Sequence, residues 1–156
     1  MKLFLKFAAL SLLAAVIWAC DDDKSYADPG KEVTAHNIAG TWRLAEWNNA
    51  SLAEGSYVYI EFIRKDGLFK MYQNLDSFGA RLRTGSFRIE TDPARGSIIR
   101  GIYDNSMSQE WNHRYIVKDL TKDRMIWIAT DDADDVSVYV RAEIPDEIIN
   151  EASAKE

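Results

Sequence analysis

Between residues 40 and 142 the chain alternates short apolar or aromatic segments with turn residues. Within each segment, apolar and polar residues mostly alternate, or β-branched and aromatic side chains dominate, which is typical of β-strands. No stretch of this region keeps the 3.6-residue period of a helix. Eight strands are predicted, at Gly40–Trp47, Tyr57–Arg64, Leu68–Asn74, Arg81–Glu90, Ser97–Tyr103, Trp111–Lys118, Arg124–Thr130 and Val136–Ala142.

Turn residues separate the predicted strands. Lys65-Asp66-Gly67 predicts a tight hairpin, and further turns are expected at Asp92–Gly96, Asp104–Ser106 and Thr121–Asp123. Eight short strands at regular spacing predict a sandwich or a closed barrel, and closure removes the exposed edges that favour aggregation. The expected fold class is all-β, a single small antiparallel up-and-down barrel of about eight strands.

Alternation along each strand assigns an interior face to the barrel. The residues predicted to point inward are apolar or aromatic, and they are Trp42, Leu44, Val58, Ile60, Phe62, Phe69, Met71, Phe87, Ile89, Tyr115, Val117, Met125 and Trp127. By the same alternation Glu46 points inward and Glu61 outward. We interpret them as a buried hydrogen-bonded group and a solvated strand residue, in preference to an acid–base pair.

The first twenty residues have the features of an export signal. Lys2 and Lys6 give a basic start, and residues 7–19 form an uncharged run that has the length of a secretory signal. A membrane-spanning helix needs about 20 apolar residues. The segment Ile17-Trp18-Ala19-Cys20 resembles the bacterial lipobox, whose cysteine becomes the acylated N-terminus after cleavage. The resemblance implies that Cys20, the only cysteine of the chain, is lipidated.

An acidic run, Asp21-Asp22-Asp23-Lys24, follows this cysteine. Its simplest interpretation is a solvated tether. It also resembles the signal with which some Gram-negative anaerobes place lipoproteins on the cell surface, whereas an aspartate at this place in enteric bacteria favours retention at the inner membrane. We expect an exported lipoprotein that is anchored to the outer membrane by the lipid on Cys20 and exposed at the cell surface.

The chain therefore divides into four parts. We predict a lipoprotein signal peptide at 1–19, the lipidated cysteine with a flexible acidic tether at 20–36, and the barrel at 37–144. Residues 145–156 form a short helix or tail, because Pro145 suits a first helical turn and acidic residues are favourable there.

Several motifs of the barrel region resemble the lipocalin-like domains of bacterial lipoproteins. Gly40-Thr41-Trp42 has the G-x-W pattern that opens the first strand of lipocalins. Further similar segments are Asp66–Phe69, Gly85–Ile89 and Tyr115–Leu120, and the resemblance spans residues 38–143. It implies that Trp42 closes one end of the barrel with Arg141 stacked across it, a contact worth about 0.5–2 kcal/mol.

Composition and motifs argue against several function classes. The net charge of −6 disfavours nucleic acid as a partner. A single cysteine cannot form an intramolecular disulfide, and two histidines cannot form a His-rich metal site. The acidic loop Asp131–Asp135 lacks the spacing of a calcium site. Because no hydrolase, zinc-protease, phosphate-loop or dinucleotide motif occurs, we expect no enzymatic activity, no metal and no cofactor.

Two binding hypotheses remain, because small barrels either fill their interior or hold one ligand. The first is a surface-tethered binding module for a small apolar or amphipathic molecule. Its candidate ligand contacts are Tyr115, Trp127, His113, Phe69 and Met71. For His113, a rim or core histidine satisfied by hydrogen bonds is the preferred interpretation.

The alternative is a filled barrel that acts as an accessory or interaction domain and binds a cell-surface protein or glycan. This hypothesis needs exposed aromatic residues, for which the candidates are Trp47, Tyr59 and Tyr72. The two hypotheses differ in the interior, since a ligand carrier needs an apolar cavity of about 300 Å³ or more.

Overall fold

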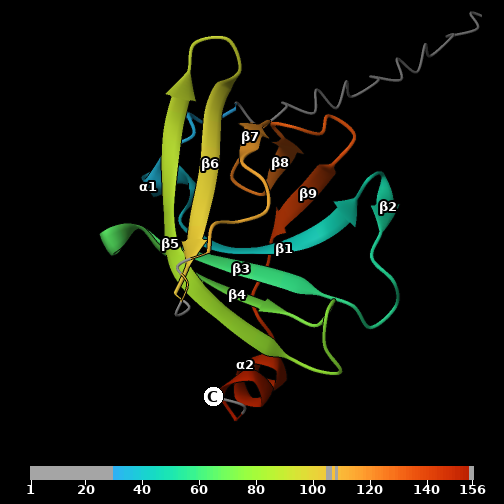
Figure 1. Cartoon of the computed structure of the whole chain (residues 1–156). Helices are drawn as coiled ribbons and strands as arrows, with labels where there is room; N and C mark the ends of the chain where they lie inside the picture. Colours follow the sequence, from blue (N-terminus) through green and yellow to red (C-terminus); the bar gives the residue numbers. More distant parts are fainter. Residues whose placement is uncertain (1–29, 105–106, 108, 155–156) are drawn as a thin grey trace, which may run out of the picture.

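The computed structural model describes residues 30–104, 107 and 109–154. Eight strands form one closed antiparallel barrel, in which each strand pairs with the next along the chain and the last pairs with the first (Figure 1). This confirms the predicted fold class. The predicted signal peptide, Cys20 and most of the predicted tether lie outside the described residues. Within the described ranges, no helix is long and apolar enough to cross a bilayer.

The barrel strands follow the predicted segments closely. They are β1 (Gly40–Trp47), β3 (Val58–Ile63), β4 (Leu68–Gln73), β5 (Arg81–Asp92), β6 (Gly96–Tyr103), β7 (Tyr115–Lys118), β8 (Arg124–Ala129) and β9 (Val136–Arg141). A two-residue strand, β2 (Ala50–Ser51), pairs with the end of β1. The predicted hairpin turn between β3 and β4 is the short helical turn η1 (Lys65–Gly67), and the helices α1 (Ala35–Ile38) and α2 (Asp146–Ser153) flank the barrel.

The interior face is the one that alternation predicts. Every residue predicted to point inward lies in, or packs against, one hydrophobic core. The core also contains residues that the prediction omitted, namely Ile38, Ile99, Trp111, Leu120 and Tyr139. Ile38 comes from α1 and Leu120 from the turn after β7, so segments outside the eight strands complete the apolar surface that the barrel removes from water.

A β-bulge in β1 reverses the predicted direction of Glu46. Leu44 pairs with Tyr139 of β9, but the next pair is Glu46 with Val138, so β1 contains one extra residue. A bulge of this kind shifts the alternation of the strand. Glu46 is therefore exposed, and the prediction that it points inward is wrong.

The segment before β7 is irregular, although it was predicted to belong to the strand. The backbone N–H of Trp111 donates to the carbonyl oxygen of Gly101 at 2.9 Å, and the indole lies directly over Gly101, where a Cβ atom would overlap the ring. This close packing draws residues 111–114 out of the sheet. His113 therefore lies in a loop. The prediction that it belongs to a strand is wrong.

The helix α2 covers two aromatic residues that were predicted to be exposed. Tyr59 and Tyr72 point outward from the barrel, but both are buried in a second apolar cluster with Ile148 and Ala152 of α2. The helix lies beside the first residues of β5 (Figure 1). The prediction of exposure is wrong for these two tyrosines, whereas Trp47 is 47% exposed as predicted.

One end of the barrel is closed by α1, Trp42 and Arg141. The Trp42 indole is fully buried, and its Nε1–H donates to the carbonyl oxygen of Ile38 at 2.8 Å. The Arg141 guanidinium lies over the indole, with Cζ 3.7 Å from the ring centroid. It also donates to the carbonyl oxygens of Ala39 and Asn37 at 2.6 and 3.0 Å. We call this arrangement the plug.

The absence of a side chain at Gly40 leaves space for the Arg141 guanidinium. Its φ angle is +103°, in the region that favours glycine. A Cβ atom on Gly40 would lie 2.6 Å from Nη1 of Arg141, so a side chain at this position would displace the guanidinium from the Trp42 ring.

The plug extends into the segment predicted as a flexible tether. The helix α1 begins at Ala35, and Oγ1 of Thr34 caps it by accepting from the backbone N–H of Asn37 at 3.2 Å. Further upstream, the backbone N–H of Lys31 donates to the carbonyl oxygen of Leu120 at 2.6 Å. The ordered domain therefore begins before residue 37, the limit expected from the sequence.

Replacing the buried indole should be costly. Trp42→Ala is expected to lower the free energy of unfolding by about 3–5 kcal/mol, because it leaves a cavity under Arg141. Urea unfolding followed by circular dichroism measures the loss. Trp47→Ala is the matched control, since Trp47 is half exposed on the same strand. Equal losses for the two variants would contradict the structural role of the plug.

Candidate functional site

The two ends of the barrel differ. At the end opposite the plug, which we call the mouth, β4 and β6 end and β5 and β7 begin. In Figure 1, β6 ends and β5 begins toward the bottom, β1 ends and β9 begins toward the right, and the described chain begins at the top. Because Lys31 is tied to the turn after β7, at the plug end, the mouth faces away from the N-terminal segment.

A small aromatic hollow lies inside the mouth. Its volume is about 110 Å³, and its walls are Met71, Tyr103, Trp111, Asn112, Tyr115, Trp127 and Tyr139. The Tyr115 and Trp127 ring centroids are 5.2 Å apart, and those of Trp111 and Trp127 are 5.6 Å apart. Burial raises the pKa of Tyr115 to about 12, so its hydroxyl is uncharged at neutral pH.

The candidate ligand contacts fall into two groups. Met71, Tyr115 and Trp127 line the hollow. Phe69 is buried one layer deeper, with its ring centroid 5.1 Å from that of Trp111. His113 is on the rim and does not line the hollow, in agreement with its preferred interpretation.

Below the hollow, aromatic side chains fill the barrel. The ring centroids of Phe62 and Phe87 are 4.8 Å apart, and those of Trp127 and Tyr139 are 4.6 Å apart. An apolar cavity of about 150 Å³ holds one benzene ring, whereas pockets for drug-sized ligands measure about 300–1,000 Å³. The hollow is smaller than that cavity, so it has room for a short aliphatic end or the inner part of one ring.

Two buried donors lie in the walls of this hollow. The indole N–H groups of Trp111 and Trp127 are buried and have no hydrogen-bond acceptor among the described residues. Leaving a buried donor unpaired costs about 1–3 kcal/mol. Both residues line the hollow, but the Nε1 atom of Trp111 lies over Gly101 and both Nε1 atoms are buried, so the hollow presents apolar ring surface and not these donors.

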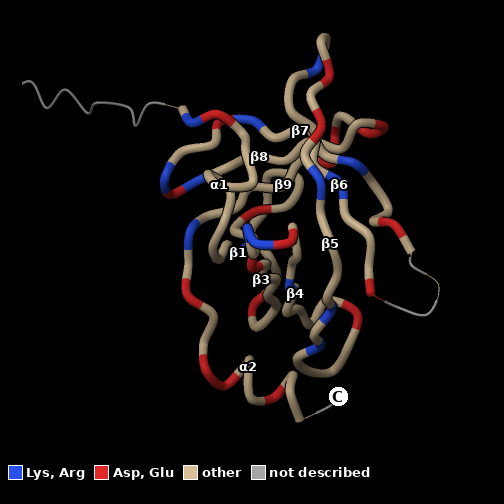
Figure 2. Tube along the Cα trace, turned by 90° about the vertical axis from the view of Figure 1, so that its left-hand side faces the viewer, with Lys and Arg blue, Asp and Glu red and all other residues tan. Residues whose placement is uncertain are grey.

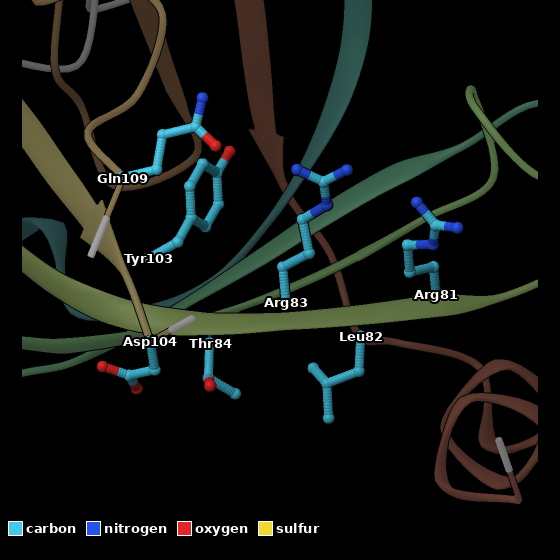
Figure 3. Close-up of a pocket in the computed structure, with 7 residues that line it drawn as sticks. All are labelled: Arg81, Leu82, Arg83, Thr84, Tyr103, Asp104 and Gln109. Carbon is cyan, nitrogen blue, oxygen red and sulfur yellow. The ribbon is translucent and has the colours of Figure 1, made fainter. Parts of the chain in front are cut away.

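A wider groove of about 470 Å³ adjoins the hollow. Its walls are Arg81, Leu82, Arg83, Thr84, Tyr103, Asp104 and Gln109 (Figure 3). Tyr103 belongs to the walls of both spaces. The phenol ring is therefore the partition between an aromatic interior and a polar opening.

The inner face of the barrel changes from aromatic to cationic toward the mouth. Three successive rows of paired residues run in this direction, and they are Phe69–Gly85–Tyr103, Met71–Arg83 and Gln73–Arg81. Directly paired residues of antiparallel strands lie on the same face. Arg83 and Arg81 therefore continue the inner face on which the aromatic side chains stand.

Asp76 holds the two arginines together. Its Oδ2 accepts from Nη2 of Arg83 at 2.7 Å and from Nη1 of Arg81 at 3.3 Å, and its Oδ1 accepts from the Gln73 amide at 2.6 Å. The Gln73 hydrogen bond, followed by the charges of the two arginines, lowers the pKa of Asp76. The carboxylate is therefore ionised at neutral pH and leaves the cluster with one positive charge in excess.

Arg83 also contacts the partition residue. Its Cζ lies 5.3 Å from the centroid of the Tyr103 ring, a distance at which a cation and an aromatic face attract each other. Burial raises the pKa of Tyr103, and the neighbouring Arg83 offsets part of this rise. Tyr103 is therefore a neutral phenol beside a fixed cation.

On the other side of the mouth, His113 faces two carboxylates. Its Nδ1 is 2.8 Å from Oδ1 of Asp131, and its Nε2 is 4.0 Å from Oδ2 of Asp135. Oδ1 of Asp135 in turn accepts from the Trp47 indole N–H at 2.7 Å. The hydrogen bond with Asp131 is the main cause that raises the pKa of His113.

The mouth arginines were missed in the sequence, although alternation places their side chains on the inner face of β5. Arg81 and Arg83 have the same parity along β5 as the buried Phe87. The sequence analysis assigned no direction to these two arginines, whereas Arg88, of the opposite parity on the same strand, is exposed. The interior of this barrel becomes polar where its strands extend past the aromatic core.

Protonated His113 is expected to stabilise the fold. Because its folded pKa is raised, this contribution is fully present below the ordinary pKa of about 6.5 and is lost as the pH rises through the folded value. His113→Gln should therefore lower the free energy of unfolding more at about pH 5.5 than at about pH 8.5, as measured by urea unfolding. His36→Gln is the control, and a folded His113 pKa below the ordinary value in an NMR titration would disprove the effect.

Acidic and basic residues are interspersed along the chain (Figure 2), so the mouth is distinguished by local geometry and not by a large field of one sign. No family model matches the chain, and no curated protein matches its sequence. The assignment of function therefore depends on the geometry of the mouth.

Proposed function

We propose that this protein is a lipid-anchored, lipocalin-like binding module that takes one small amphipathic molecule at the mouth of its barrel and has no enzymatic activity. The observation that carries the proposal is the shared wall at Tyr103, which joins an aromatic hollow of about 110 Å³ to a polar groove of about 470 Å³. An apolar space that opens on convergent polar groups is the usual form of a small-molecule site.

The filled interior limits what the site accepts. The hollow has room for a short aliphatic end or the inner part of one ring, and the rest of the ligand lies in the groove outside it. The ligand is therefore held by its end and is not enclosed. Of the two ligand types expected from the sequence, a small apolar or a small amphipathic molecule, this arrangement favours the amphipathic one, because a fully enclosed apolar ligand needs a larger cavity.

The proposed anchor is consistent with access to the mouth. Lipidation of Cys20 places the membrane next to the N-terminal segment, and the described chain enters the domain at the plug. The mouth lies at the other end of the barrel. We propose that the domain stands on the outer membrane at the cell surface, with the mouth directed away from the lipid.

A second candidate function is an interaction domain that binds a protein or glycan. The observation in its favour is the loop between β4 and β5, in which Phe78 is fully exposed and Leu75 is 48% exposed. Exposed apolar side chains of this size can mark a contact surface. The burial of Tyr59 and Tyr72 weakens this second function. Of the three aromatic residues predicted to be exposed for it, Trp47 alone is exposed.

Native mass spectrometry of the full protein, purified from the membranes of its own host, tests the proposal. The expected spectrum shows a chain that begins at Cys20, carries acyl chains and holds one small adduct per protein. Met71→Phe should abolish the adduct by filling the hollow, and Lys70→Gln, on the outward face of the same strand, should retain it. A lipidated chain without any adduct would favour the interaction domain, and a chain without acyl mass would contradict the anchor.

A further inference from the structure

The arginine pair at the mouth identifies the chemical class of the ligand. We propose that Arg81 and Arg83 bind the carboxylate of an amphipathic acid, whose apolar end lies against the aromatic hollow. This inference rests on the proposed function, since it specifies the ligand of the same mouth. Three features of the mouth support it: the direction of the arginine side chains, the charge of their cluster and the distance from the cluster to the hollow.

The two guanidinium groups stand on the inner face of the barrel. Figure 3 shows the side chains of Arg81 and Arg83 on the same side of β5 as Tyr103, while Leu82 and Thr84 point to the other side. The alternation of a strand produces this arrangement. Both guanidinium groups extend from this inner face into the groove, whose walls also include Leu82 and Thr84 at the edge of β5 that β6 does not cover.

The cluster of Arg81, Arg83 and Asp76 has one net positive charge, which fits a monoanion, and the other carboxylate in the groove wall, Asp104, points to the opposite side of β5 (Figure 3). Two guanidinium groups share one carboxylate, Asp76, and both of the ion pairs use the same oxygen, Oδ2. An arginine side chain has five N–H donors in a planar fork that matches the two oxygens of a carboxylate. With 49% and 36% of their side chains exposed, Arg81 and Arg83 have donors that a ligand can reach from the groove.

The spacing of the rows fits an acid with a short linker. Arg83 stands one row beyond the Tyr103 row on the inner face, and successive residues on one face of a strand are about 7 Å apart. An aromatic ring in the hollow and a carboxylate at Arg83 are therefore separated by a chain of a few methylene groups. An aryl-alkanoic acid or the end of a medium-chain fatty acid has this form.

Two probes that differ only in their head group test the inference. 4-Phenylbutyrate carries the ring, linker and carboxylate, and 4-phenylbutan-1-ol replaces the carboxylate with a neutral hydroxyl. Each is titrated into the ¹⁵N-labelled protein, and the indole N–H signals of Trp111 and Trp127 report occupancy of the hollow by NMR. The acid is expected to bind more tightly than the alcohol, by about tenfold for one charge-assisted contact.

Charge variants separate the arginine site from the hollow. Arg83→Gln should weaken binding of the acid by about tenfold and leave the alcohol unchanged. Asp76→Asn should tighten binding of the acid, because it removes the carboxylate that competes for the same donors. Arg88→Gln is the matched control, since it removes the same charge from the outward face of the same strand and should change neither affinity.

The outcomes distinguish this inference from the proposed function. In one outcome, both probes shift the indole signals, but Arg83→Gln and Arg81→Gln leave the affinity for the acid unchanged. The mouth then binds small molecules, and the assignment of the two arginines as the carboxylate site is contradicted. If neither probe shifts these signals at millimolar concentration, the hollow is not a binding site and the proposed function fails as well.

Discussion

The packing of Arg141 on the buried indole of Trp42 sets the two ends of the barrel apart. The indole is a large flat side chain at the start of β1, and the guanidinium over it donates to carbonyl oxygens of α1, of Ala39 and of the turn at Lys122. The hydrogen bonds to Ala39 and to Asn37 of α1 connect segments that lie about a hundred residues apart in the sequence. With this end closed and the described chain entering beside it, the mouth is the end of the barrel at which we propose that a ligand binds.

Aromatic packing then decides how much of the interior remains for a ligand. Trp111 lies on Gly101 and, together with Trp127 and Tyr139, occupies the space between the plug and the mouth. Large rings in close contact stabilise the core through their buried area and their edge-to-face contacts. The same packing reduces the cavity to about 110 Å³. The same side chains therefore stabilise the core and form the walls of the proposed binding site, whereas the polar groups of that site lie on the extended part of β5.

Much of the fold could be predicted from the sequence because its signals are local. Period-two alternation fixed which face of each strand is inside, and turn residues fixed where strands end. The predictions that were wrong concern residues whose positions depend on contacts between distant segments. The bulge that turns Glu46 outward depends on the pairing of β1 with β9, and the burial of Tyr59 and Tyr72 depends on where α2 docks. His113 lies outside the strand predicted for it, because the preceding segment packs tightly through Trp111 on Gly101.

The candidate site was predictable in part for the same reason. Met71, Tyr115 and Trp127 have the alternation of interior residues and do line the hollow. Arg83 also has the alternation of an interior residue. Its position at the mouth depends on how far β5 extends beyond the end of β6, and the register between these strands shows this extension. The sequence therefore indicates the aromatic half of the site, and the three-dimensional pairing adds the cationic half.

The central claim is that one amphipathic acid binds end-on at the mouth. A crystal structure of the protein grown with 4-phenylbutyrate tests it most directly. The expected electron density places the phenyl ring beside Tyr115 and Trp127 and the carboxylate within hydrogen-bond distance of Arg83. Density for the probe on the loop that carries Phe78, with an empty mouth, would contradict the claim and support a contact surface there.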